Sequence, residues 1–469
     1  MPSAPEPAEY RPETPISELA DWLGDPVAPA DFPETNVRFR NDRWAAAVGL
    51  GELSDSDWVR HFGRFEPLEG NLPQPLALRY HGHQFRVFNP EIGDGRGFLF
   101  AQMRDRAGRL LDLGTKGSGQ TPWSRAGDGR LTLKGGVREI LATEMLEALG
   151  VYTSKTFSIV ETGEKLERGD EPSPTRSAVM TRLSHGHIRI GSFQRLLVLE
   201  EKEHMEALVA YCLEHIPGPP PPEDAPGREE PAVRLMHLVV ERMADLAASW
   251  MVAGFVHGVL NTDNMNIFGE SFDYGPWRFL PKWEPGFTAA YFDHQGLYAF
   301  GRQPEALHWN CGQFAIALRL LADAPPLIAA MERFGPLYME AVGRRWRWRL
   351  GLVPKGGEED GRLVGACEAE MAASGEQPDA FFYRLRTGGA TGEIAQLLSA
   401  YERVEDTHPY WSEGAPESML IDEVEAIWSA IDERDDWQPL HEKVARLRRI
   451  GDAHGPAPVP CGHISQNSI

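Results

Sequence analysis

The chain has 469 residues and a formal net charge of −22 at pH 7. This length allows a large buried core, arranged as two or three domains or as one elaborated catalytic unit. The acidic balance argues against nonspecific binding to nucleic acids, because phosphate backbones repel a negative surface, so any anionic ligand must meet a local group of basic residues.

The N-terminal residues predict neither a signal peptide nor a transit peptide, because they are rich in proline and acidic residues and contain no apolar run. No uncharged apolar stretch reaches the roughly 18 residues that a membrane span needs. The four cysteines are far apart and form no CxxC pair, which favours free thiols over a zinc module or a disulfide scaffold. We therefore expect a cytoplasmic protein with no nucleic-acid or membrane partner.

The first half of the chain predicts a β-rich region. Residues 85–103 predict two strands around a glycine-rich turn, and residues 109–115 predict another strand. Apolar residues recur at helical spacing over residues 133–149, which predicts a helix, and further strands are expected at 156–160 and 177–183.

The second half predicts mainly helices. A proline-rich loop at 217–226 precedes an amphipathic helix at 235–250, and residues 303–450 are largely helical. We expect an α+β fold in four parts. These are an N-terminal extension packing on the fold (1–75), a β-rich nucleotide-binding lobe (76–190), a helical catalytic lobe (191–450) and a flexible tail (451–469).

One segment has the outline of the catalytic and metal-binding loops of protein kinases. Those sites contain H-R-D-x-x-x-x-N and then D-F-G, in which the first Asp takes the acceptor proton and the Asn and second Asp hold Mg²⁺. Here His257 and Asn264 keep the kinase separation, and Asp273-Tyr-Gly275 stands at the place of D-F-G. Asn264 and Asp273 are therefore predicted to hold Mg²⁺ or Mn²⁺ together with phosphate oxygens and water.

The proton acceptor is where this outline differs from a kinase. Val259 occupies the position of the catalytic Asp, and a carboxylate returns at Asp263, next to the predicted metal ligand. We expect the acceptor to have moved to Asp263. This predicts altered chemistry in a protein-kinase-like fold with two lobes.

Five features follow one another in the order that a kinase uses: a glycine-rich turn at 93–97, Lys116, Glu139 and the two loops. The glycines would let backbone amides approach phosphates, and an ion pair with Glu139 would orient the Lys116 ammonium. Taken singly, the turn is also typical of ordinary hairpins, and the charges of Lys116 and Glu139 are also typical of solvated surface residues. The ordered set favours an ATP site.

Arg182 and Arg189 stand where a kinase has the apolar segment that receives adenine. Guanidinium groups suit phosphates better than adenine. If both side chains point into the cleft, the triphosphate lies where adenine normally lies, and the α-phosphate faces the acceptor. Attack there would transfer AMP and release pyrophosphate. Surface ion pairs are the alternative role for these arginines.

Several segments between residues 80 and 315 form a specific pattern. They are Tyr80-His-Gly-His-Gln-Phe85, Gly93-Asp-Gly-Arg96, Leu113-Gly-Thr-Lys-Gly-Ser-Gly-Gln-Thr-Pro-Trp-Ser-Arg125, Gly127-Asp-Gly-Arg130, Phe255-Val-His-Gly-Val-Leu-Asn-Thr-Asp-Asn264, Asp273-Tyr-Gly-Pro276 and Phe292-Asp-His-Gln-Gly-Leu-Tyr-Ala-Phe300. This pattern closely resembles the selenoprotein O family. The resemblance implies a kinase-like fold that binds ATP in an inverted orientation and transfers AMP to Ser, Thr or Tyr hydroxyls of other proteins.

Carried over residue by residue, the resemblance implies a proton acceptor at Asp263 and metal ligands at Asn264 and Asp273. The nucleotide contacts that it implies are Gly93, Gly95, Arg96, Lys116, Asp128, Gly129, Arg182, Arg189 and Asp273.

The chain departs from the family pattern at its C-terminal end. Family members carry a redox-active cysteine or selenocysteine there; this chain has Cys461, and the loop after Asp273 has no cysteine to pair with it. This argues against redox gating by a disulfide.

Three functions therefore remain open: an adenylyltransferase, a kinase with a relocated base, and a nucleotide-binding module without catalysis. The arginine pair favours the first, and the retained lysine, glutamate and metal ligands disfavour the third.

Overall fold

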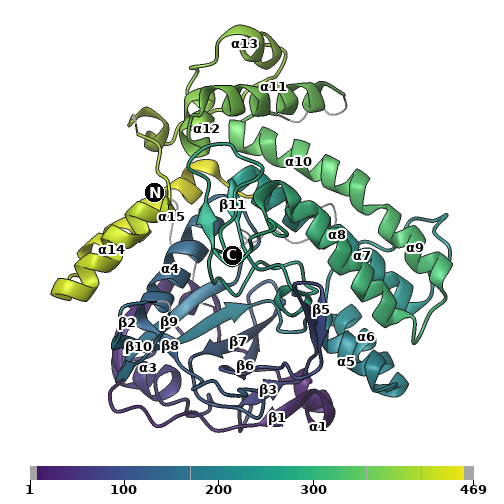
Figure 1. The fold of residues 1–469 in the computed structure, drawn as a ribbon, viewed down its shortest axis with the longest axis vertical. Helices are drawn as coiled ribbons and strands as arrows, with labels where there is room; N and C mark the ends of the chain where they lie inside the picture. The colour runs from purple at the N-terminus through teal and green to yellow at the C-terminus, as the bar shows by residue number, and fades with distance from the viewer. Residues whose placement is uncertain (1–7, 170, 354–357, 414, 459–469) are drawn as a thin grey trace.

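A computed structural model describes residues 8–169, 171–353, 358–413 and 415–458 of the chain. Its largest sheet is antiparallel and lies in the lower part of Figure 1, with most of the longer helices above and beside it. The strands lie side by side in the order β1 (Gly24–Pro26), β3 (Leu76–Leu78), β6 (Leu99–Arg104), β7 (Leu110–Lys116), β10 (Thr175–Ser184), β9 (Lys155–Leu166) and β2 (Asn36–Arg40), and β8 (Leu131–Thr132) pairs with β10.

The strands predicted at 109–115, 156–160 and 177–183 are confirmed as β7, β9 and β10. The two strands expected within 85–103 also exist, but they belong to different sheets. β6 joins the large sheet, whereas β5 (Val87–Asn89) pairs with β4 (Gly82–Gln84) in a separate hairpin. The glycine-rich segment 93–97 is therefore a loop between two sheets, and the alternative that it is an ordinary hairpin turn is wrong.

The N-terminal segment supplies both edges of the large sheet. β1 pairs with β3 at one edge, and β2 pairs with β9 at the other. In α3 (Asp55–Phe62), the buried Trp58 ring stacks on Phe157 of β9, and the buried Phe62 ring meets Phe157 edge-on. This segment thus builds part of the core as well as covering it. The division of the chain into four parts stays a prediction.

The helix predicted at 133–149 is confirmed as α4 (Leu133–Ala148). It begins at Thr132, whose hydroxyl accepts a hydrogen bond from the Gly135 amide at 3.1 Å, as is typical of an N-cap. One side of α4 lies on β9 and β10, and α15 covers another. This packing holds the middle of α4 against the sheet.

The central helix of the remaining part is α7 (Pro231–Ala253), which packs on α6, α8, α9 and α10. It confirms the amphipathic helix at 235–250, and the proline-rich loop before it is free of helix and strand. The other helices are α1 (Ala20–Leu23), α2 (Asp42–Ala47), α5 (Ile190–Val198), α6 (Lys202–His215), α8 (Gln303–Leu318), α9 (Ala324–Glu332), α10 (Phe334–Leu350), α11 (Glu358–Ser374), α12 (Pro378–Arg386), α13 (Gly392–Leu398), α14 (Ile421–Arg434) and α15 (Gln438–His454).

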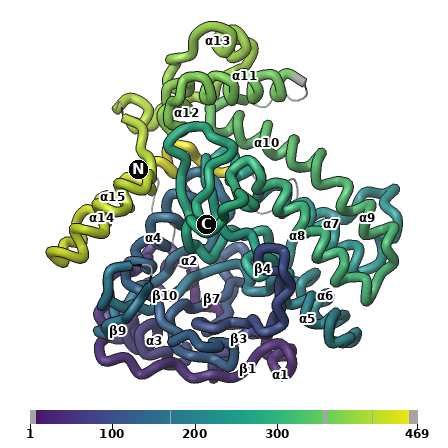
Figure 2. The backbone as a smooth tube through the Cα atoms, in the orientation of Figure 1, coloured from purple at the N-terminus to yellow at the C-terminus, as the bar shows by residue number. Residues whose placement is uncertain are grey.

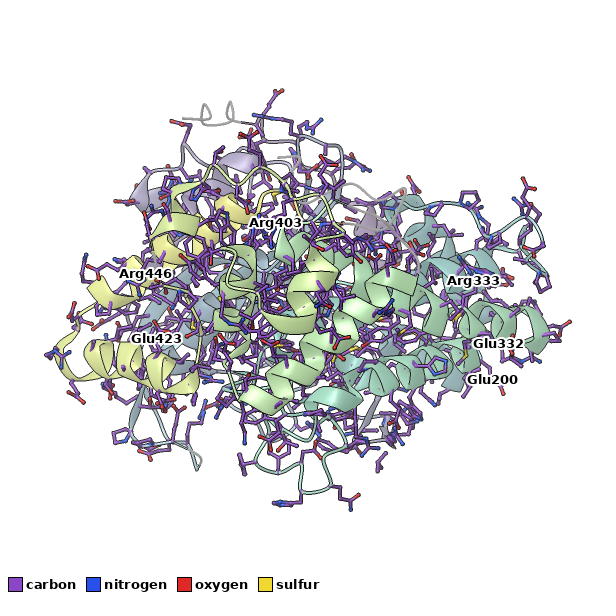
Figure 3. The ribbon with its side chains drawn as sticks, turned by 90° about the horizontal axis from the view of Figure 1, so that it is seen from above. Glu200, Glu332, Arg333, Arg403, Glu423 and Arg446 are labelled. Atoms are coloured by element: carbon purple, nitrogen blue, oxygen red, sulfur yellow. The ribbon has the colours of Figure 1, made fainter. Side chains whose placement is uncertain are left out.

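Charged side chains cover the outside of the helical part, where Glu200, Glu332 and Arg446 are exposed (Figure 3). Within the described residues, no helix is both long enough and apolar enough to cross a membrane. Cys212, Cys311 and Cys367 are buried free thiols, as expected, and Cys461 lies outside the described residues.

Candidate active site

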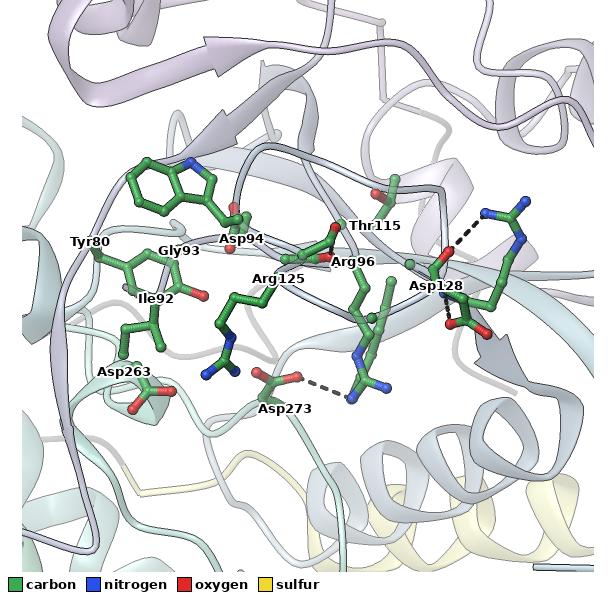
Figure 4. Close-up of a pocket in the computed structure, with 18 of the residues that line it drawn as sticks. Tyr80, Ile92, Gly93, Asp94, Arg96, Thr115, Arg125, Asp128, Asp263 and Asp273 are labelled. Carbon is green, nitrogen blue, oxygen red and sulfur yellow. Dashed lines mark hydrogen bonds and ion pairs between the residues drawn. The ribbon is translucent and has the colours of Figure 1, made fainter. Parts of the chain in front are cut away.

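A cavity of about 660 Å³ lies between the sheet and the loops that follow α7 (Figure 4). All the predicted site residues except Glu139 and Asn264 line it. These are Gly93, Gly95, Arg96, Lys116, Asp128, Gly129, Arg182, Arg189, Asp263 and Asp273.

The lining is locally cationic although the chain as a whole carries a charge of −22. It contains seven basic and four acidic side chains. This is the local basic group that an anionic ligand would require. The basic residues are Arg96, Lys116, Arg125, Arg130, Arg168, Arg182 and Arg189.

Lys116 and Glu139 form a buried ion pair. Lys116 ends β7, Glu139 lies in the middle of α4, and the Lys116 Nζ is 2.5 Å from the Glu139 Oε1. Both side chains are buried, so neither is a solvated surface charge. Because α4 is fixed on the sheet, Glu139 holds the ammonium group at one position, 3.0 Å from the Asp273 Oδ1.

Three buried cations converge on Asp273. Besides Lys116, the Nη1 atoms of Arg182 and Arg189 each lie 3.5 Å from a carboxylate oxygen of Asp273. Burial alone would raise the pKa of Asp273, but Lys116, Arg182 and Arg189 hold that pKa well below its ordinary value. The carboxylate is therefore ionised. Surface pairing, the alternative for the two arginines, is wrong, because both are buried at this cavity.

The backbone of Asp273 is held in an unusual conformation. Its φ is 65°, in the left-handed region, which costs a residue other than glycine about 1–3 kcal/mol, and such residues cluster at functional sites. The neighbouring carbonyl of Phe272 accepts a hydrogen bond from the His257 Nε2 at 2.9 Å. Burial lowers the pKa of His257, so the ring is neutral and its Nε2 carries the proton. His257 thus ties the loop at 257–264 to the segment that presents Asp273.

Asp263 lies in a short helical turn, η2 (Thr262–Asn264), and its side chain is buried at the cavity wall. Burial raises the pKa of Asp263 to about 6, and the charge of Arg189 opposes this rise. Within the described residues its Oδ1 has no hydrogen-bond partner. Arg189 donates a hydrogen bond to the Asp263 backbone carbonyl at 2.7 Å, which fixes the turn. A buried carboxylate oxygen without a partner is suited to accept a proton.

Asn264 does not line the cavity. Its amide nitrogen donates to the Val259 carbonyl at 3.1 Å, which leaves its amide oxygen for another ligand. Across the described ranges, no cluster of three His, Cys, Asp or Glu side chains could hold a metal. The donor set of Asn264 and Asp273 therefore fits a hard cation such as Mg²⁺ or Mn²⁺ only if phosphate oxygens and water supply the other ligands.

Comparisons with known proteins identify the family. The sequence profile described as "Protein adenylyltransferase SelO" matches residues 8–407. The chain belongs to the SelO family. It is 41% identical over 472 residues to the "Protein nucleotidyltransferase YdiU" of Synechocystis sp., covering 93% of this chain and 97% of the relative. The proteins of that name from Synechococcus elongatus and Vibrio cholerae are 40% and 37% identical, over 94% and 74% of this chain and 95% and 69% of the relatives.

In this SelO family member, the loop between β7 and β8 closes over the glycine-rich segment. The Ser124 hydroxyl donates to the Gly95 carbonyl, and the Trp123 ring lies against Gly93. A Cβ at Gly93 would be only 2.5 Å from the ring, and one at Gly95 would be 2.9 Å from the Trp123 carbonyl oxygen. Glycine is therefore required here for packing between the two loops, independently of any approach to phosphates.

The same loop brings Arg125 to the cavity, a residue that sequence reasoning did not select. Its guanidinium points into the cavity on the side of Asp263 and Asp273 (Figure 4). Arg168, another lining arginine, is paired with Asp128 at 2.8 Å, whereas the Arg125 side chain has no hydrogen-bond or ion-pair partner among the described residues. Arg125 could have been selected from its position at the end of segment 113–125, which resembles the selenoprotein O family.

Proposed function

We propose that this chain transfers AMP from ATP to Ser, Thr or Tyr hydroxyls of other proteins and releases pyrophosphate. Membership of a family described as a protein adenylyltransferase supports the reaction type. One observation carries the proposed orientation of ATP. Lys116, Arg182 and Arg189 converge on Asp273 inside the cavity.

This arrangement supports an inverted nucleotide. Adenine carries no negative charge, so it would leave the buried guanidiniums of Arg182 and Arg189 without a phosphate to bind. A phosphate would accept charge-assisted hydrogen bonds from both. We therefore place the β- and γ-phosphates at the two arginines, with the α-phosphate facing the acceptor hydroxyl. Adenine then lies toward Asp128 and Gly129 at the outer part of the lining.

The proposed reaction is a single displacement at the α-phosphorus. The acceptor hydroxyl loses its proton to the Asp263 carboxylate while its oxygen forms a bond to the α-phosphorus. The bond from that phosphorus to the oxygen bridging to the β-phosphate breaks, and pyrophosphate leaves with the electron pair. Lys116, Arg182 and Arg189 offset the negative charge that develops on the leaving group.

Asn264 and Asp273 would hold Mg²⁺ or Mn²⁺, which would supply additional positive charge at the phosphates.

The proposal includes a kinase-like fold with two lobes. The chain order of the glycine-rich loop, the Lys116–Glu139 pair and the two loops supports this fold. A cytoplasmic location stays a prediction.

The test uses ATP labelled separately at the α- and γ-phosphates, with mass spectrometry of the modified proteins. Label from the α-position, together with a mass increase of one AMP, is the expected result. Asp263→Asn is the matched control, because it keeps the size of the side chain and removes the acceptor. Label arriving only from the γ-position would instead support a kinase, and tight ATP binding without any transfer would support a noncatalytic module.

A further inference from the structure

Aromatic side chains gather outside the nucleotide cavity, where the β4–β5 hairpin meets the segment before α8. Tyr291 and Phe292 are 77% and 42% exposed. The Phe292 ring centroid lies 5.1 Å from that of Tyr291 and 5.7 Å from that of Phe85. We call Phe85, Tyr291 and Phe292 the aromatic rim. Adjoining exposed aromatic rings are unusual on a free protein surface and mark interaction sites.

The aromatic rim is fixed to the catalytic loop by hydrogen bonds. The Phe85 amide donates to the Asn261 Oδ1 at 2.9 Å, and the Tyr298 hydroxyl donates to the same oxygen at 2.9 Å. The Tyr298 ring also lies 5.0 Å from Phe85. Asn261 is two residues before Asp263, so the rim is anchored beside the proposed proton acceptor. Figure 2 shows the hairpin next to the start of α8.

A second cavity, of about 720 Å³, extends from the aromatic rim along residues 285–302. Tyr291 belongs to both features. Asp293 shapes this segment, because its carboxylate accepts hydrogen bonds from the amides of Leu297 and Tyr298, each at 2.8 Å. The cavity is open to the surface.

The charged side chains near the aromatic rim have partners within the protein. Arg86, on the same hairpin, and Arg302 lie 3.2 and 3.4 Å from Glu305, and the Asp293 carboxylate accepts hydrogen bonds from backbone amides. The rim itself presents aromatic rings. A ligand that matches this surface is itself apolar and uncharged where it meets the rim.

We infer that the aromatic rim and the adjoining cavity dock the acceptor segment of the protein substrate, with a large apolar side chain near the acceptor hydroxyl resting on the rim. This inference rests on the proposed function. In that reaction ATP fills the inner side of Asp263, so the acceptor must arrive from outside the nucleotide cavity. The rim is an exposed surface fixed beside that approach, and aromatic side chains are enriched at the centres of protein interfaces.

The experiment uses a synthetic peptide library. Each peptide has one Ser, Thr or Tyr and degenerate flanking positions, and peptides that acquire AMP from α-labelled ATP are sequenced by mass spectrometry. The wild type is compared with the double variant Tyr291→Ser/Phe292→Ser. The matched control is Ile316→Ser/Met339→Ser, which changes residues that are 52% and 62% exposed on α8 and α10, outside the rim.

We expect the wild type and the control to select Leu, Ile, Met or Phe close to the acceptor. The rim variant should lose this selection, and its kcat/KM for the best peptide should fall about tenfold or more, as at a contact in the centre of an interface. Its Kd for ATP should stay within about twofold of wild type, because the rim does not line the nucleotide cavity. An unchanged Kd also shows that the variant is folded.

Two kinds of outcome contradict different statements. If the wild type shows no apolar selection, if the rim variant keeps it, or if no peptide is labelled although pyrophosphate is released, the docking surface is wrong and the proposed function stands. If label arrives only from the γ-position, or if ATP is not consumed, the proposed function is wrong and the docking inference is withdrawn with it.

Discussion

Arg182 allows a direct test of the orientation of ATP. In the described part of the chain the only hydrogen-bond or ion-pair partner of its side chain is Asp273, at 3.5 Å, and its guanidinium lies 5.0 Å from the centre of the Phe272 ring. Replacing Arg182 by Met keeps a long side chain against that ring and removes the charge. Asp273 retains Lys116 and Arg189, so the fold should be preserved.

The magnitude depends on the number of phosphates in the ligand. A hydrogen bond between a charged group and a phosphate contributes about 1.5–3 kcal/mol. In Arg182→Met the Kd for ATP should therefore rise about 10- to 150-fold, at ~1.4 kcal/mol for each factor of ten. AMP lacks the β- and γ-phosphates, so its Kd should change less than about threefold. The change in Kd for ADP should lie between the changes for AMP and ATP.

Isothermal titration calorimetry of AMP, ADP and ATP measures these differences, with Arg168→Met as the matched control. Arg168 lines the same cavity but is paired with Asp128 and not with Asp273. Its loss should therefore change the Kd values of AMP, ADP and ATP by more similar factors than the loss of Arg182 does. Equal losses of affinity for AMP and ATP in Arg182→Met would refute the inverted orientation. Unchanged affinity for all three would refute a phosphate contact by Arg182 altogether.

Four other parts of the site can be tested by single variants. Lys116→Met should lower AMP transfer about 100-fold or more, and Glu139→Gln should lower it less, because a preorganised charge is lost or loosened; wild-type rates in both would contradict the pair's role. Asp263→Asn should lower kcat and leave the Kd for ATP within about twofold, measured by steady-state kinetics and calorimetry; a large loss of affinity would contradict a role as proton acceptor. Asp273→Asn should abolish transfer yet tighten binding of ATP in the presence of a chelator, because it removes a carboxylate that competes with the phosphates for three cations; weaker binding would contradict this. Arg125→Ala should raise the Kd for ATP about tenfold by calorimetry, if its unpaired guanidinium meets a phosphate; an unchanged Kd would exclude that contact.

Local patterns predicted the parts of the fold that depend on nearby residues. The 3.6-residue period located α4, and the strand pattern before Lys116 located β7, because each element is specified by its own sequence. Glu139 and Lys116 could then be paired by analogy with the order of parts in a kinase. Their 2.5 Å contact depends on α4 packing across the sheet, which no local pattern contains.

The features that sequence reasoning missed depend on long-range contacts or on loops without a period. β2 pairs with β9, although more than a hundred residues separate them, and short edge strands carry little pattern of their own. The loop between β7 and β8 folds back on the glycine-rich segment through Trp123 and Ser124, and only this contact brings Arg125 to the cavity. The glycines there were predicted from their use near phosphates, whereas the structure also requires them for packing.

The charge distribution around Asp273 couples ATP to the metal. In the structure three cations, Lys116, Arg182 and Arg189, surround Asp273. Lys116 is also paired with Glu139, and Arg189 with Asp94. In the proposed complex those cations turn to the phosphates, which bring several negative charges, and Asp273 is left ionised beside them. A divalent cation held by Asp273 and a phosphate oxygen would relieve that repulsion. Binding of ATP should therefore strengthen binding of Mg²⁺, and by thermodynamic reciprocity Mg²⁺ should strengthen binding of ATP by the same factor. Neutralising Asp273 removes the site of this coupling, which is why metal-free ATP should then bind more tightly while transfer is lost.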